Sequence, residues 1–91
     1  MDRPAPYDIV VSLAGHDAGR SYMVTGAAEG RLLLCDGRLR RMENPKIKSP
    51  KHVRIAARGE NAPASDRMIR ETIALTAETA GAKEVQVLGK G

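Results

Sequence analysis

Apolar and polar residues alternate along the first two thirds of the chain in short runs that are typical of β-strands. These runs carry valine, isoleucine and tyrosine, which favour extended backbone. The third run, RLLLC, is almost wholly apolar, as expected of a strand that is covered on both faces. Strands are therefore predicted at residues 7–13, 21–25, 31–35, 38–42 and 52–58.

Alternation also assigns side chains to the two faces of each predicted strand. In the last run, Val53, Ile55 and Ala57 share one face. Arg54 and Arg58 then share the opposite face, and the fourth run places Arg38 and Arg40 on the side away from Leu39 in the same way. The pattern thus predicts arginine side chains on the side of the sheet that faces away from the core.

Segments rich in glycine and proline separate the runs. AGHDAGR, residues 14–20, and GAAEG, residues 26–30, are expected to reverse the chain. Asp36-Gly37 predicts a two-residue hairpin turn, and ENPKIKSPK, residues 43–51, is expected to be a loop. Short strands joined by tight turns indicate a mainly β fold, and specifically a small SH3-like β-barrel of five strands.

The predicted barrel covers residues 7–58, after a flexible lead at 1–6, and one C-terminal α-helix follows it at residues 65–80. Ser65 or Asp66 can cap this helix, and its apolar residues are small, so weak packing on the barrel is expected. Residues 81–91 are expected to form a tail. Within the tail, residues 84–88 alternate like a short strand, which either pairs with a barrel edge or is loose.

Composition limits the chemistry that the chain can perform. Ninety-one residues fit one small domain, and two Tyr without Phe or Trp leave an aliphatic core and few rings for base stacking. One Cys and two His fall short of a structural zinc site, so no metal or other cofactor is expected. Cys35 lies among leucines and is interpreted as a buried apolar residue, with a reactive thiol as the alternative. With neither a signal peptide nor a membrane segment in the sequence, a cytoplasmic protein without a membrane partner is expected.

Positive charge is concentrated in one part of the chain. The formal net charge is +4, yet residues 38–58 alone carry +7, with Glu43 as the single acid in that segment. Such a block is typical of a contact with a polyanion, and the alternative is a solvated basic surface without a partner. The basic residues of the block are Arg38, Arg40, Arg41, Lys46, Lys48, Lys51, Arg54 and Arg58.

The loop AGHDAGR does not have the pattern of an enzyme site. A P-loop needs four residues between its glycines and then Lys and Ser or Thr, whereas three residues separate Gly15 from Gly19 and Arg20 follows. His16 and Asp17 are neighbours in a turn, where adjacent side chains usually diverge. We therefore expect no enzymatic activity and no small-molecule substrate. The glycines fit a tight reversal that needs positive φ, alone or together with the close approach of a ligand.

The same residues carry a resemblance to a known family. DIVVSLAGHDAGRSYMVT resembles the KOW motif of ribosomal proteins and transcription elongation factors, with Gly19 at the hallmark glycine and Arg20 at the basic residue after it. LLLCDGRLRRMENPKIKSPKHV is similar to the continuation in bacterial KOW-domain RNA-binding proteins related to the archaeal–eukaryotic large-subunit ribosomal protein family fourteen. The resemblance covers about residues 7–80.

The resemblance implies RNA binding, with ribosomal RNA as the expected target and a role in translation or ribosome assembly. By position, the contacts would come from Gly15, His16, Gly19 and Arg20 and from the eight basic residues given above. His16 stands where the family pattern has arginine, so a strong phosphate contact is not expected there. The alternative is a protein-interaction module of the translation or transcription machinery, with ribosomal proteins among its partners.

Overall fold

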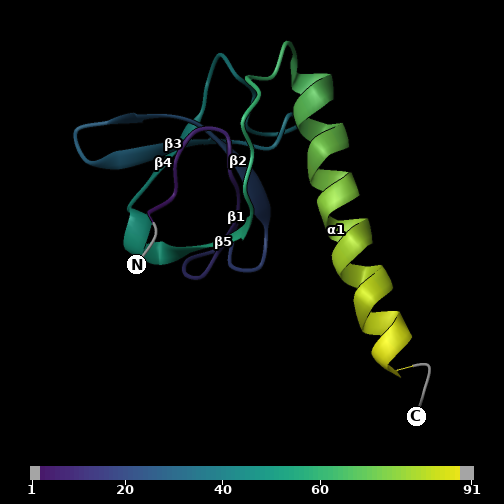
Figure 1. The fold of residues 1–91 in the computed structure, drawn as a ribbon. Helices are drawn as coiled ribbons and strands as arrows, with labels where there is room; N and C mark the ends of the chain where they lie inside the picture. Colours follow the sequence, from purple (N-terminus) through teal and green to yellow (C-terminus); the bar gives the residue numbers. More distant parts are fainter. Residues whose placement is uncertain (1–2, 89–91) are drawn as a thin grey trace.

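The computed structural model describes the backbone of residues 3–88 and the side chains of residues 3–77. Within these residues, one five-stranded antiparallel sheet is followed by one long helix (Figure 1). The elements are β1 (Ile9–Ser12), β2 (Ser21–Ala28), β3 (Arg31–Cys35), β4 (Lys46–Lys48), the 3-10 helix η1 (Pro50–His52), β5 (Val53–Ala57) and α1 (Asp66–Leu88). The mainly β fold with a C-terminal helix is thus confirmed.

The strand order in the sheet is β4-β3-β2-β1-β5, so the last strand pairs with the first. β1 pairs with both β2 and β5, so it is an interior strand of the sheet, with β2 at the centre. β4 and β5 form the two edges, and no pairing closes the sheet between them in the part of the chain described here. The five strands therefore form an open sheet, and the predicted closed barrel is not confirmed.

Apolar side chains form two clusters that use alternate residues of the same strands. The first cluster draws on β1, β2, β3 and β5 and contains Val10, Tyr22, Val24, Leu32, Leu34 and Val53. The second contains Ile9, Met23 and Cys35 from the strands together with Ile69 from α1. Because successive side chains of a strand point to opposite faces, the two clusters cover opposite faces of the sheet.

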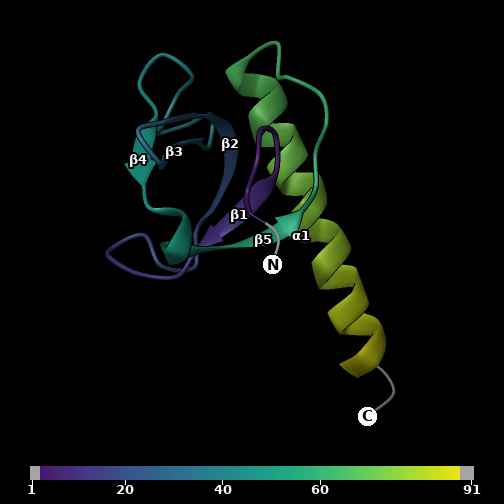
Figure 2. The same cartoon turned by 60° about the vertical axis from the view of Figure 1, so that its left-hand side comes forward.

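The first turns of α1 cover the second cluster, and the rest of the helix extends past the sheet (Figures 1 and 2). Ile69 is fully buried and Ile73 packs against the same cluster, whereas Met68 and Leu75 on the helix are exposed. The Ser65 hydroxyl accepts a hydrogen bond from the Met68 N–H at 3.3 Å, as the predicted cap requires. No helix in the described part of the chain has the length and apolar character needed to span a membrane.

The predicted strand at 84–88 is helical in the structure, because α1 continues to Leu88. Gly81 does not end the helix, which therefore exceeds the predicted range of 65–80. Alternation over five residues is a weak signal, and it is also compatible with a continuing helix when the residues on either side are helical.

The predicted hairpin at Asp36-Gly37 is replaced by a ten-residue loop, the β3–β4 loop at residues 36–45, and the returning strand is β4. The predicted strand at 38–42 is thus loop, and the predicted loop at 43–51 contains a strand. One Asp36 carboxylate oxygen accepts backbone N–H groups from Arg38 at 2.8 Å and Arg40 at 2.9 Å. Those N–H groups are satisfied within the loop rather than by a neighbouring strand.

Gly37 explains why the chain turns here without forming the hairpin. Its φ is +79°, and a Cβ added to it would lie 2.3 Å from the carbonyl oxygen of Asp66. The Asp66 carboxylate in turn accepts the Met42 N–H at 2.8 Å. The glycine therefore lets the β3–β4 loop lie directly against the start of α1.

A β-bulge changes the facing of side chains near the end of β5. Ile9 pairs with Ala57 and Val10 pairs with Ile55, so Ala56 is an extra residue between the two pairs. Ile55 packs against the first cluster, whereas Ala57 packs against the second. The predicted common face of Ile55 and Ala57 is therefore wrong, because strict alternation fails at the inserted residue.

Candidate nucleic-acid interface

The glycine loop, residues 14–20, is a compact turn that directs one side chain inward. Gly15 and Gly19 have φ values of +88° and +89°, which favour glycine. The Gly19 N–H donates to the Ser12 carbonyl at 2.8 Å, and the Arg20 N–H donates to the Asp17 carbonyl at 2.9 Å. With the turn held in this way, Asp17 is buried while His16 and Arg20 on either side of it are exposed.

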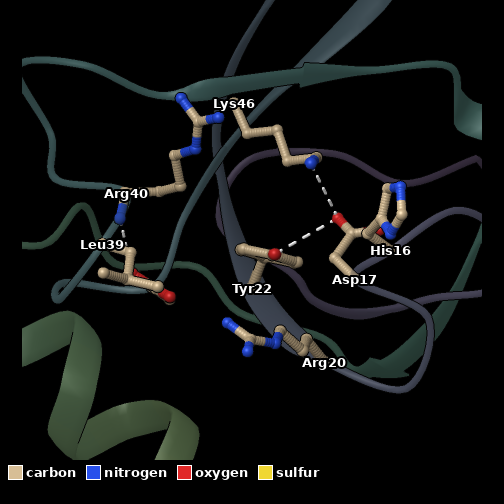
Figure 3. Close-up of a pocket in the computed structure, with 8 residues that line it drawn as sticks. His16, Asp17, Arg20, Tyr22, Leu39, Arg40 and Lys46 are labelled. Atoms are coloured by element: carbon tan, nitrogen blue, oxygen red, sulfur yellow. Dashed lines mark hydrogen bonds and ion pairs between the residues drawn. The ribbon is translucent and has the colours of Figure 1, made fainter.

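Asp17 is the centre of a polar cluster beneath the glycine loop (Figure 3). Its Oδ1 accepts the Ser12 hydroxyl at 2.9 Å and Lys48 Nζ at 3.0 Å. Its Oδ2 accepts the Tyr22 hydroxyl at 3.2 Å and pairs with Lys46 Nζ at 3.1 Å. We call these five residues the Asp17 cluster. The cluster joins β1, β2 and the edge strand β4 to the glycine loop.

The environment of the cluster shifts the pKa values of two of its members. Burial by itself raises the pKa of Asp17, but hydrogen bonds from Lys48, Ser12 and Lys46 outweigh it, and the net pKa lies well below the ordinary 3.8. Burial, followed by the nearby charge of Asp17, raises the pKa of Tyr22 to about 12. Asp17 is therefore an anion and Tyr22 a neutral donor over the physiological pH range.

A depression of about 260 Å³ lies beside the Asp17 cluster, and we call it the first depression. It brings the glycine loop together with the β3–β4 loop and β4, which are distant in sequence. Arg20 and Arg40 lie on two sides of Tyr22, with His16 on the far side of Asp17 (Figure 3). The residues that line it are His16, Asp17, Arg20, Tyr22, Asp36, Leu39, Arg40 and Lys46.

The cations around the first depression differ in their availability to a ligand. Lys46 and Lys48 are ion-paired with Asp17, and Lys48 Nζ also donates to the Ala14 carbonyl at 2.9 Å. Arg20 and Arg40, in contrast, form no ion pair within the described residues. The depression therefore presents two arginines whose charge is not matched by a contacting carboxylate.

Arg58, a predicted RNA contact, takes part in a different interaction. Its guanidinium donates to the buried Asp8 carboxylate at 2.6 Å and to the Arg3 carbonyl at 3.1 Å. Asp8 also accepts the N–H groups of Ala5 at 2.9 Å and Gly59 at 3.2 Å. Arg58 thus anchors the N-terminal lead to the end of β5, and residues 3–6, predicted to be flexible, are held at this point.

The remaining predicted contacts do not gather in one place. Arg38 and Arg41 are exposed on the β3–β4 loop, close to the first depression in sequence but not part of its lining. Lys51 lies in η1 and Arg54 in β5, both exposed. The structure thus brings together the glycine loop, Arg40 and the two β4 lysines, whereas the last three basic residues of the block do not line the first depression.

Sequence reasoning assigned no role to Asp17 and Tyr22 in the cluster. A signal for them exists in KIK: Lys46 and Lys48 share one face of β4, and they require an anion if that face is covered. That signal depends on recognising β4 as a strand, which the two nearby prolines obscured.

Cys35 is fully buried, as its position among leucines predicts. Its Sγ donates to the Arg41 carbonyl at 3.4 Å and lies 3.6 Å from Thr25 Oγ1. Burial raises the pKa of the thiol, which disfavours the thiolate. Cys35 is therefore a packing residue rather than an exposed nucleophile. In the described residues, no three His, Cys, Asp or Glu side chains are grouped so that they could hold a metal ion.

No family model matches the chain, and no curated protein matches it in a sequence search.

Proposed function

We propose that this protein is an RNA-binding protein of the KOW type, with an SH3-like fold, and that it contacts ribosomal RNA in translation or ribosome assembly. One observation carries the proposal: Arg20 and Arg40, from loops distant in sequence, both line a single depression and contact no carboxylate of the described residues. The strand order, in which β1 pairs with β5, and the resemblance of residues 7–80 to KOW-domain proteins support the same proposal.

The chemistry of the depression favours phosphate as the contacted group. A guanidinium group presents several N–H donors in a planar fork, which matches the oxygens of a phosphate. Exposed glycines at positions 15 and 19 add no side chain that would keep a nucleic-acid backbone away from the loop. Because Asp17 already pairs with Lys46 and Lys48, these two lysines shape the surface more than they bind phosphate.

Charge reversal tests the RNA contact. Replacing Arg38, Arg40 and Arg41 together by Glu is expected to abolish RNA binding in a filter-binding assay while circular dichroism shows an unchanged fold. The matched control reverses Arg3, Arg31 and Arg67, which are exposed and change the net charge equally. If the folded triple variant binds RNA as tightly as the wild type, the proposal is wrong.

Sedimentation at two salt concentrations tests the cellular target. Cell lysate is separated on a sucrose gradient and the fractions are probed for this protein. Migration with large-subunit particles that is lost at high salt would support a phosphate contact with ribosomal RNA. Migration with precursor particles alone would indicate a role in assembly. A position at the top of the gradient at both salt concentrations would contradict the ribosomal target.

A role as a protein-interaction module is the alternative, and salt also separates it from RNA binding. An apolar protein interface changes little with salt, whereas the release of counterions from several phosphates makes RNA affinity fall steeply. Association with ribosomal particles that resists high salt would favour the protein contact.

A further inference from the structure

A second depression, of about 330 Å³, lies between the start of β2, the β3–β4 loop and α1. It shares Arg20 and Asp36 with the first depression, so the two adjoin at these residues. The residues that line it are Arg20, Ser21, Asp36, Arg38, Arg70, Ile73 and Ala74. A basic path therefore leads from Lys46 on β4 across Arg20 to the helix.

Arg70 gives this path a fixed cation on α1. Its guanidinium donates to the Gly37 carbonyl at 2.7 Å, which holds the half-buried side chain against the β3–β4 loop. A guanidinium has five N–H donors, so this contact leaves most of them available. Arg38, in the same depression, is exposed and has no ion pair with the described residues. The Asp36 carboxylate beside them accepts two backbone N–H groups of its own loop.

The path offers few groups that stack on bases. Tyr22 is 3% exposed and its hydroxyl is bound to Asp17, while Tyr7 packs against the second cluster. The chain has no Phe or Trp, and among the residues that line the two depressions only His16 carries an exposed ring. Arginine and lysine donors are suited to phosphate oxygens, which are the same along any RNA sequence.

We propose that one RNA strand follows this path, with phosphates in both depressions, and that Arg20, Arg38 and Arg70 hold the second part of the strand with little regard to base sequence. The inference rests on the proposed function and extends its surface from the sheet onto α1. It assigns a role to Arg70, which lies outside the basic block of residues 38–58. Arg20 is the shared contact, because it lines both depressions.

Fluorescence anisotropy with labelled oligouridine and oligoadenosine tests this inference on the full chain. Arg38→Ala and Arg70→Ala are each expected to weaken binding of both probes by roughly tenfold and to reduce the salt slope by about one. Arg67→Ala is the matched control: Arg67 is on the same helix, is exposed, and pairs with Glu71 at 3.1 Å instead of lining the path. It should leave both affinities unchanged. Since Arg70 also contacts Gly37, Arg38→Ala provides the variant without a structural side effect.

The outcomes separate this inference from the proposed function. If the wild-type protein binds neither probe nor ribosomal RNA, both proposals are wrong. If it binds but Arg38→Ala and Arg70→Ala behave like Arg67→Ala, the contact stays in the first depression and the path over α1 is wrong. An affinity for one probe more than about tenfold above the other would overturn the sequence independence.

Discussion

Lys48 Nζ lies 3.0 Å from Asp17 Oδ1, and this ion pair ties the edge strand β4 to the glycine loop. Both side chains are largely buried, at 11% and 9% exposed. The buried Asp17 carboxylate therefore offsets the positive charge of Lys46 and Lys48, which the fold places beside it. Arg20 and Arg40, in contrast, form no ion pair with any residue that the structure describes.

Replacement of Asp17 by Asn should destabilise the protein, because it leaves Lys46 and Lys48 without their anion and places an amide donor beside them. We expect the free energy of unfolding in urea to fall by about 3 kcal/mol, as when one partner of a buried ion pair is removed. Glu71→Gln is the control. It removes the anion of the exposed Arg67–Glu71 pair, which should change stability by less than about 0.5 kcal/mol. Equal small losses in the two variants would show that the Asp17 cluster does not stabilise the fold.

The Asp17 contribution should also depend on pH. The pKa of Asp17 is lowered in the folded protein, so below about pH 5 the unfolded chain takes up a proton that the folded protein does not. Lower pH therefore favours unfolding, and the stabilisation is lost as pH falls toward the folded pKa. The gap in unfolding free energy between the wild type and Asp17→Asn should be full at pH 7 and narrower at pH 3. A gap that stays constant between these pH values would contradict the lowered pKa.

Gly37→Ala should cost more stability than Gly30→Ala, although both glycines have positive φ, at +79° and +77°. A Cβ at Gly30 meets nothing within 4 Å, so only the backbone penalty of about 1 kcal/mol applies. A Cβ at Gly37 would collide with the Asp66 carbonyl, for a total of about 3 kcal/mol. Urea unfolding of the two variants measures the difference. If they lose the same stability, the β3–β4 loop does not lie tightly against α1.

Variants of Arg58 and Arg40 should show that stability and RNA binding depend on different arginines. Arg58→Ala leaves the buried Asp8 without its guanidinium partner and is expected to cost about 2 kcal/mol of stability, with RNA affinity within about twofold of the wild type. Arg40→Ala should weaken RNA binding and leave stability nearly unchanged, since Arg40 lines the first depression and forms no ion pair with the described residues. Urea unfolding and anisotropy on the same two proteins check both halves. A strong loss of RNA affinity in Arg58→Ala would show that Arg58 does contribute to RNA binding, contrary to this prediction.

Sequence patterns predicted the elements whose local signals agree with their packing. β1, β2 and β5 were placed by alternation and β-branched residues, β3 by its apolar run, and the start of α1 by its cap at Ser65. The β3–β4 connection was missed because Asp36-Gly37 has the local signature of a tight hairpin. Its conformation depends instead on the contact between Gly37 and Asp66 of α1, which are 29 positions apart, and no local pattern contains such a contact.

The positive charge of the candidate site was predicted, but which of its cations pair with carboxylates was not. All eight basic residues of the block were predicted RNA contacts. In the folded protein, however, Asp17 pairs with the two β4 lysines and Asp8 pairs with Arg58. Such pairs join residues that are 31 and 50 positions apart, so they become visible only once the strand order is known. Arg70 was overlooked for the same reason, because only the fold brings it beside Gly37.

Ala56, the extra residue in β5, decides on which side the chain leaves the sheet. Before it, the strand contributes to the first cluster; after it, Ala57 packs on the side where Ile69 docks. The segment that leads to α1 therefore starts from the face that the helix covers and does not have to cross the sheet edge. If β5 continued regularly at this point, Ala56 would pair with Ile9 and Ala57 would face the first cluster instead. The bulge in β5, as much as the apolar residues of the helix, therefore determines the side of the sheet on which α1 and Arg70 come to lie.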